Sequence, residues 1–272
     1  MQAIHIAKRE IQIGFRNPWA YSFLALFSLF SLALLLIQAQ AYMEGYTHTT
    51  GAMLNLILYL LPLMTLLLGS FSITSEKEEG SWQLLSTYPL STSAFLGGKY
   101  LGLAAVLIAI ISFGYGLSGL VGALFGKGFT LSLLLFFFLF SILLILLFLG
   151  IAVWIGTFCQ NRWQALTVGV SIWFLFILAW PTLLISVLGW LPYQAIKPAV
   201  QILTILNPAE LVRIFMVIKM GGGSIFGPEY YQWVDWLKTS MGTTLFAVFC
   251  LLWVVLMMTG SILSWERRRY RG

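Results

Sequence analysis

The chain has 272 residues, of which 60% are hydrophobic and only 9% carry a charge, and its mean hydropathy is +0.93. These values lie far outside the range of soluble domains and predict an integral membrane protein. The net charge of +6 does not indicate nucleic-acid binding, because the basic residues gather at chain ends and loop edges without an aromatic-interleaved patch. Cys159 and Cys250 have no metal-ligand or paired spacing, so we expect neither a metal site nor a disulfide framework.

Residues 1–18 carry an apolar stripe on one side of a helix and polar or basic side chains on the other. The stripe contains Ile4, Ala7, Ile11 and Phe15. This pattern is typical of an amphipathic helix that lies in the membrane interface. The first span follows at about 20–41. Its apolar run is too long for a signal peptide, whose apolar region has about 7–15 residues, and we expect it to remain as a span.

Five further apolar segments are long enough to cross a bilayer, which takes about 20 helical residues. They cover about 53–73, 99–124, 131–158, 165–188 and 241–265. Gly98 and Gly102 have the small-xxx-small spacing of closely packed membrane helices, although glycine is also simply common in such helices. Pro181 removes a backbone donor from the fifth span and predicts a bend there.

Six spans place both termini on one side of the membrane. The region 190–240 then lies on the other side, and we expect two short apolar helices there, separated by Asn207-Pro208. Ten of the fifteen Lys and Arg residues fall on the side of the termini, which the positive-inside rule makes cytoplasmic. These ten are Lys8, Arg9, Arg16, Lys77, Lys99, Arg162, Arg267, Arg268, Arg269 and Arg271.

A polar segment at about 75–95 joins the second and third spans on the same side. We interpret it as a short amphipathic helix with acidic residues at its N-terminus, where they meet the positive end of the helix dipole, and with Pro89 at its end. Such a helix is a docking surface for a partner; an ordinary loop with solvated acids is the alternative. The candidate contact residues are Glu76, Glu78, Glu79, Gly80, Trp82, Leu84, Leu85, Tyr88 and Pro89.

The sequence lacks the usual groups for chemistry inside the membrane. No Asp, Glu, Lys, Arg or His lies near the middle of a predicted span, which argues against ion-coupled transport and against an intramembrane hydrolase. Gly126-Lys127 does not complete the phosphate-loop pattern, because Val121 stands where the first glycine is needed and Gly128 where Ser or Thr is needed. We therefore expect no enzyme activity and no cofactor on this chain, and any energy has to come from a partner.

Three stretches carry a resemblance. Residues 79–90 with Gly98-Lys99 resemble the coupling segment of ABC-2 type permeases. Residues 166–176 and 206–213 are similar, within that family, to the permeases of complexes that support maturation of the copper sites of nitrous oxide reductase. The resemblance implies a homodimer in the bacterial inner membrane. It also implies a cytoplasmic ABC ATPase subunit that binds ATP and Mg²⁺ and docks on segment 75–95.

On the outer side, the same resemblance implies a periplasmic β-helix protein and a copper chaperone as partners. A general ABC-2 exporter of another small molecule or lipid is the alternative. A mechanical role, in which ATPase motion passes outward without a transported substrate, is a second hypothesis, and a membrane enzyme is a third. The outer contacts that the resemblance implies are Asn207, Pro208, Arg213, Tyr230 and Trp233.

Overall fold

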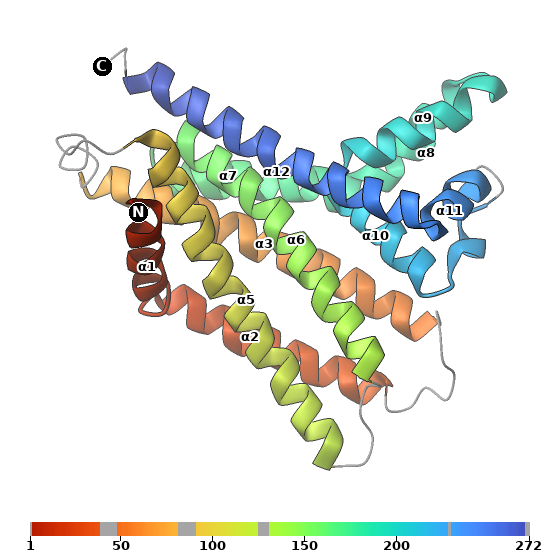
Figure 1. The fold of residues 1–272 in the computed structure, drawn as a ribbon, viewed down its shortest axis with the longest axis horizontal. Coiled ribbons are helices and arrows are strands. Elements are labelled where there is room, and N and C mark those ends of the chain that lie inside the picture. The colour runs from red at the N-terminus through yellow and green to blue at the C-terminus, as the bar shows by residue number, and fades with distance from the viewer. Residues whose placement is uncertain (1, 39–47, 81–90, 125–130, 228–229, 270–272) are drawn as a thin grey trace.

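The computed structural model describes residues 2–38, 48–80, 91–124, 131–227 and 230–269, and every regular element within them is a helix (Figure 1). The predicted all-helical membrane fold is therefore confirmed. In chain order the helices are α1 (Gln2–Gly14), α2 (Pro18–Gln38), α3 (His48–Glu78), α5 (Thr92–Leu124), α6 (Leu131–Phe158), α7 (Arg162–Trp173), η1 (Phe174–Ala179), α8 (Trp180–Trp190), α9 (Tyr193–Leu206), α10 (Pro208–Lys219), η2 (Gly223–Ile225), α11 (Tyr231–Lys238) and α12 (Ser240–Arg269).

Five to six helical segments of the described residues have the length and composition of membrane spans. The five long ones are Thr50–Glu78, Thr92–Leu124, Leu131–Phe158, Arg162–Trp190 and Ser240–Arg267. The predicted first span corresponds to α2, whose Pro18–Ala33 is a shorter apolar helix. The sixth candidate is the α9–α10 pair, which is bent by 107° between Leu206 and Pro208 and is apolar enough to be a broken span or a re-entrant loop.

Helix α6 forms the centre of the bundle and contacts α3, α5, α7, α10 and α12. Its contact with α3 is close because a glycine on each helix lies directly against a side chain of the other. A Cβ at Gly69 of α3 would lie 2.5 Å from the Cβ of Ala152, and a Cβ at Gly156 of α6 would lie 2.8 Å from the Cβ of Ile73. The core therefore depends on glycine-mediated helix packing, as expected where lipid offers no hydrophobic driving force between helices.

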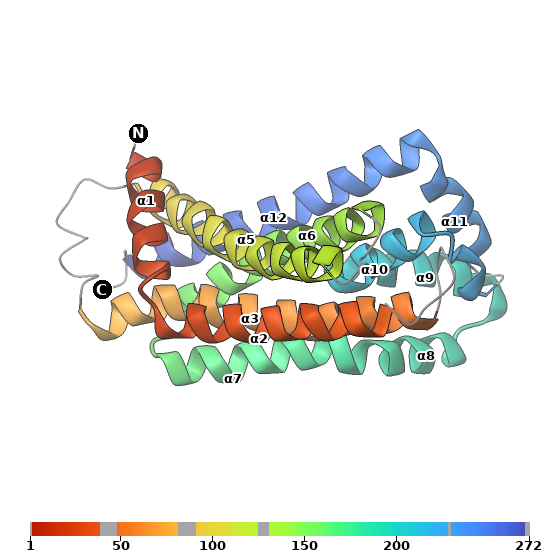
Figure 2. The ribbon, with the colours of Figure 1, turned by 90° about the horizontal axis from the view of Figure 1, so that it is seen from below.

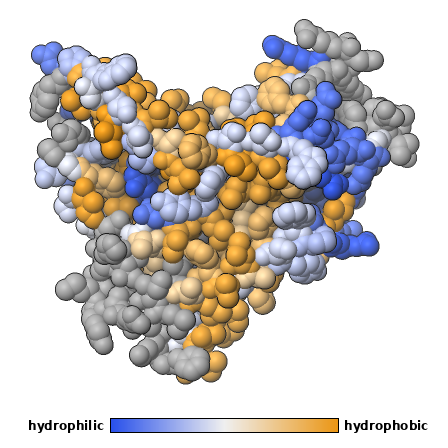
Figure 3. Space-filling model, turned by 180° about the vertical axis from the view of Figure 1, so that it is seen from behind, coloured by the Kyte–Doolittle hydropathy of each residue, from blue (hydrophilic) through white to orange (hydrophobic). Residues whose placement is uncertain are grey.

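The two termini lie at one end of the molecule, and helices α9 and α11 lie at the other (Figure 1 and Figure 2). Seen from behind, the middle of the surface is hydrophobic, and hydrophilic residues gather most densely towards the end with the termini (Figure 3). We call this the terminal end. The arrangement agrees with spans that cross a bilayer and return the chain to the side where it began.

The N-terminal helix forms within the predicted range, but its buried face overlaps the predicted apolar stripe only in part, at Ala7 and Ile11. Ile4 is 70% exposed, whereas Glu10 and Gly14 are buried. The reason is that α1 packs on the glycine stripe of α5. A Cβ at Gly98 would lie 2.7 Å from the Cβ of Ile6, and one at Gly102 would lie 2.6 Å from the Cβ of Glu10. The small-xxx-small spacing is thus a packing face, and its partner is α1.

The fifth span passes through the π-helical turn η1, which ends two residues before Pro181, and then continues as α8. In a π-helical turn the carbonyl of Phe176 would accept from the residue five positions later, which is Pro181 and has no N–H. The side chain of Asn207 takes that place, and its Nδ2 donates to the Phe176 carbonyl at 2.7 Å. The structure therefore has a π-helical turn before Pro181, held by the start of α10, where the sequence predicts a bend.

Candidate functional site

The acidic residues after the second span belong to the last turn of α3 and to the turn that follows. Helix α3 continues to Glu78, and Gly80 then adopts a φ of +69°. The prediction that these acids begin a separate helix is wrong. Each of them meets a basic side chain here, which offsets the unfavourable position of a carboxylate at a helix C-terminus. The predicted contact residues of the segment that follows lie outside the described residues: Trp82, Leu84, Leu85, Tyr88 and Pro89.

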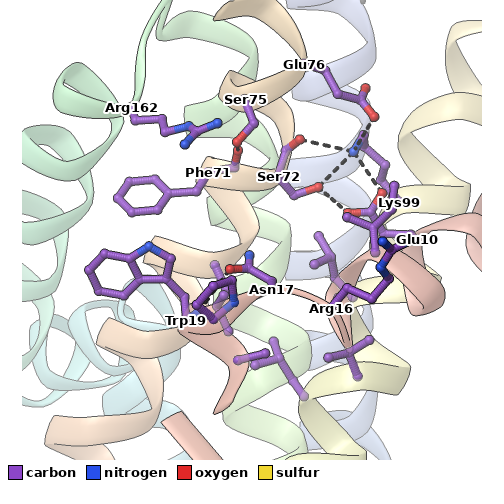
Figure 4. A pocket seen from close by; sticks show the side chains of 18 of the residues that line it. Glu10, Arg16, Asn17, Trp19, Phe71, Ser72, Ser75, Glu76, Lys99 and Arg162 are labelled. Carbon is purple, nitrogen blue, oxygen red and sulfur yellow. Dashed lines mark hydrogen bonds and ion pairs between the residues drawn. The ribbon is translucent and has the colours of Figure 1, made fainter. Parts of the chain in front are cut away.

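A buried charge cluster joins α1, α3 and α5 (Figure 4). The ammonium of Lys99, whose side chain is 1% exposed, lies 2.9 Å from Glu10 Oε2 and 3.2 Å from Glu76 Oε1. It also donates to the Ser72 carbonyl at 3.1 Å and to Ser72 Oγ at 2.8 Å. The Ser72 hydroxyl in turn donates to Glu10, and Arg9 pairs with Glu76 at 3.2 Å. We use the term charge cluster for Arg9, Glu10, Ser72, Glu76 and Lys99.

The charge cluster contains two carboxylates and two cations, so its formal charges balance. Buried ions are tolerated when they are paired and hydrogen-bonded, and removal of one partner leaves an uncompensated charge at a cost of about 3–5 kcal/mol. The cluster lies towards the terminal end of three helices. Sequence reasoning missed it because Lys99 was interpreted as a topology signal and as part of the family resemblance, and not as the partner of an acidic residue. The available signal was Gly98-Lys99, since a lysine beside a packing glycine lies close to a helix interface.

Lys77, the residue after Glu76, binds the C-terminal end of α6. Its ammonium donates to three carbonyls at the C-terminus of that helix, those of Gly156 at 2.6 Å, Thr157 at 3.0 Å and Cys159 at 2.8 Å. It also lies 4.9 Å from the ring centre of Trp265 in α12. A cation at the carbonyl end of a helix satisfies unpaired acceptors and meets the negative end of the helix dipole.

Glu78 and Glu79 hold the beginning of α7. Glu78 Oε1 accepts from the backbone N–H of Arg162 at 2.7 Å, and its Oε2 lies 3.0 Å from Arg162 Nε. Glu79 adds a contact of 3.2 Å to Arg162 Nη2. The carboxylates therefore lie at the positive end of the dipole of α7, which is not the helix that the sequence predicted for them.

Four consecutive residues thus bind four neighbouring helices. We call residues 76–79 the α3 hub: Glu76 contacts α1 and α5, Lys77 contacts α6, and the last two contact α7. The hub forms the beginning of segment 75–95, in which the sequence predicts a docking helix. A displacement of that segment would therefore act on several helices at once.

A cavity of about 740 Å³ lies beside the charge cluster, between the α1–α2 junction and helices α3, α5 and α7 (Figure 4). Its wall includes cations, among them Arg16 and Arg162, and the carboxylates of Glu78 and Glu79. Trp19 and apolar residues of α3 and α5 complete it. We call it the elbow cavity, after the turn at Asn17-Pro18 that joins α1 to α2.

The predicted outer contact residues have structural roles within this chain. Asn207 is fully buried and caps α10, because its Oδ1 accepts from Ala209 N at 2.9 Å. Pro208 and Trp233 are also buried, Arg213 is paired with Glu210, and the Tyr230 ring lies near Phe226. A contact with an outer partner stays a prediction. Of this set, Tyr230 and Arg213 are partly exposed in the described structure.

Comparison with known proteins agrees with the resemblance found in the sequence. The family described as ABC-2 family transporter protein matches residues 4–269. The chain is 29% identical over 235 residues to the probable ABC transporter permease protein NosY of Stutzerimonas stutzeri, which covers 83% of this chain and 85% of the relative. It is 31% identical over 217 residues to the protein of the same description from Pseudomonas aeruginosa, with 77% and 79% covered. This chain therefore belongs to the ABC-2 family of transporter permeases.

Proposed function

We propose that this chain is the membrane subunit of an ATP-driven complex, in which a separate ABC ATPase docks on segment 75–95 and pushes on the α3 hub. The observation that carries the proposal is that the hub, which forms the start of this segment, contacts four helices. ATP and Mg²⁺ belong to the ATPase subunit. In this reading the permease supplies a path for mechanical work and no catalytic group.

A path for that work runs along the fifth span. Glu78 and Glu79 hold the N-terminus of α7 at the terminal end, and Asn207 holds the π-helical turn η1 further along the same span. A shift of the hub would therefore move a helix whose far part is tied to α10. Packed helices with specific polar contacts are the kind of element that carries such coupling between distant sites.

The similarity to NosY supports a more specific assignment. We propose a NosY-like homodimer in the bacterial inner membrane, with cytoplasmic termini and an ATPase of the NosF type, that serves maturation of the copper sites of nitrous oxide reductase. A β-helix protein of the NosD type and a copper chaperone would be its periplasmic partners. The work of this chain would be signalling to these partners or export. A general ABC-2 exporter of another small molecule or lipid is the alternative.

The test is purification of the tagged chain from its native membrane in a mild detergent, with the bound proteins identified by mass spectrometry. We expect an ABC ATPase together with a periplasmic β-helix protein. An ATPase alone would support the general exporter, and a preparation without any ATPase would refute the proposed function.

A pair of variants tests the docking face itself. Leu85→Asp places a charge where burial of leucine contributes roughly 1.5–3 kcal/mol and should release the ATPase. Gln83→Asp, on the polar side of the same predicted helix, is the matched control and should retain it. Equal retention by both variants would show that the docking face has been assigned wrongly.

A further inference from the structure

The elbow cavity has a charged end and an apolar end. On α3 its wall changes from Glu76 to Leu68, and on α5 it changes from Lys99 to Leu107. Eight residues separate each pair, which is roughly 12 Å along a helix that rises 1.5 Å per residue. On both helices the charged residue is the one nearer the terminal end. The ligand that fits such a cavity is an amphiphile.

The charged end lies at the level of the membrane surface. Trp19 and Trp163 line the cavity and are 53% and 78% exposed. Exposed tryptophan is typical of the belt at which membrane helices meet the headgroups of the lipids. An amphiphile bound here would therefore have its polar group in the headgroup layer and its apolar part among the helices, as a membrane lipid does.

The charges that remain after internal pairing indicate the kind of headgroup. The charge cluster is balanced by itself, whereas the carboxylates of Glu78 and Glu79 share the single cation of Arg162. On the opposite wall, Arg16 has no ion pair among the described residues. Asn17 beside it uses its Oδ1 to accept from Trp19 N at 3.0 Å, so its amide nitrogen is available to donate. One wall thus offers donors and positive charge, and the other offers an excess carboxylate.

We propose that the elbow cavity binds a zwitterionic phospholipid with a primary amine in its headgroup. The phosphate would accept hydrogen bonds from Arg16 and Asn17, and the ammonium would donate to the carboxylates of Glu78 and Glu79. In Figure 4, Arg16 and Asn17 lie in the lower part of the view, and Arg162, which pairs with Glu78 and Glu79, lies in the upper part. The acyl chains would lie along the apolar wall formed by α3, α5 and α7.

This headgroup follows from the charge pattern. An anionic phosphatidylglycerol headgroup would satisfy the arginine wall but bring a second negative charge to the excess carboxylate. A trimethylated amine would carry the right charge but has no N–H to donate to a carboxylate. A primary ammonium supplies both the charge and the hydrogen bonds. The lipid would also fill the space next to the α3 hub, and the proposal does not depend on the ATPase.

The experiment is native mass spectrometry of the purified full-length protein, incubated with equimolar phosphatidylethanolamine, phosphatidylcholine and phosphatidylglycerol of identical acyl chains. We expect phosphatidylethanolamine to be retained in preference to both others. Arg16→Gln removes a charge-assisted hydrogen bond and should lower its retention about tenfold. Glu78→Gln with Glu79→Gln should remove the preference for the primary amine over the trimethylated amine.

Lys8→Gln is the matched control, because Lys8 is an exposed cation of α1 that does not line the cavity, and it should bind as the wild type does. Unchanged retention in Arg16→Gln would overturn the proposal. So would equal or stronger binding of phosphatidylglycerol by the wild type, or a wild-type protein that retains no lipid. Because Arg16 is exposed, its substitution is not expected to impair folding, and the comparison of the three lipids tests the wild type alone.

Discussion

Substitution of Lys99 by methionine should destabilise the protein more than its conservative size suggests. Methionine fills a similar volume without charge. Among the described residues, the change leaves the carboxylate of Glu10, whose side chain is 4% exposed, with only the Ser72 hydroxyl as a partner. Glu76 keeps Arg9. Breaking a buried pair from one side costs about 3–5 kcal/mol, and we expect a loss of that size in the free energy of unfolding.

The measurement is denaturant-induced unfolding in detergent, followed by tryptophan fluorescence. Lys99→Met combined with Glu10→Gln removes the unpaired buried charge of Glu10 and should recover much of the lost free energy of unfolding. We expect a coupling energy of about 1–3 kcal/mol in the double-mutant cycle. Lys8→Met is the control, since exposed substitutions stay within about 0.5 kcal/mol. A Lys99→Met protein that unfolds like the wild type, or a cycle that is purely additive, would refute the charge cluster.

Two further predictions concern the contacts that hold α1 and α10. Gly102→Leu should detach α1 and expose it to protease, because even a Cβ at Gly102 would lie 2.8 Å from the Ala7 carbonyl oxygen. Gly116→Leu on the same helix is the control. A Cβ at Gly116 would have no atom within 4 Å, so this variant should leave digestion unchanged. Asn207→Ala should lower the free energy of unfolding by about 2–3 kcal/mol, because α10 loses its N-cap and the Phe176 carbonyl loses its donor. Asn207→Ser keeps a side chain that can cap α10, so its free energy of unfolding should fall by less. Equal digestion of the two glycine variants, or equal stability of the two Asn207 variants, would contradict these assignments.

The spans could be predicted because hydropathy over about 20 residues is a local property. Most of the long helices fall close to the predicted ranges, and the two helices separated by Asn207-Pro208 form as expected. The buried face of α1 could not be predicted in the same way. Its apolar stripe is a property of α1 alone, but the face that packs is chosen by Gly98 and Gly102, which are nearly a hundred residues later in the chain.

The acidic residues of the α3 hub could be singled out from the sequence, but their contacts could not. The acidic cluster stands out in the sequence because it interrupts apolar segments, and it lies at the point where several helices meet. What the sequence does not reveal is the partner of each side chain. Glu76 pairs with Lys99, and Glu78 pairs with Arg162. No sequence pattern links the members of either pair, which come together only because α5 and α7 pack beside α3.

The geometry of a helix explains why four consecutive residues can hold so many neighbours. Successive side chains of an α-helix point about 100° apart, so Glu76, Lys77 and Glu78 face three directions from one turn. Apolar packing at the same place would allow helices to slide past one another at small cost, whereas each of these polar contacts has a defined partner and is lost when that partner moves away. A rotation of the last turn of α3 therefore cannot preserve all the contacts together. A displacement of segment 75–95 would therefore rearrange several helices of the bundle together.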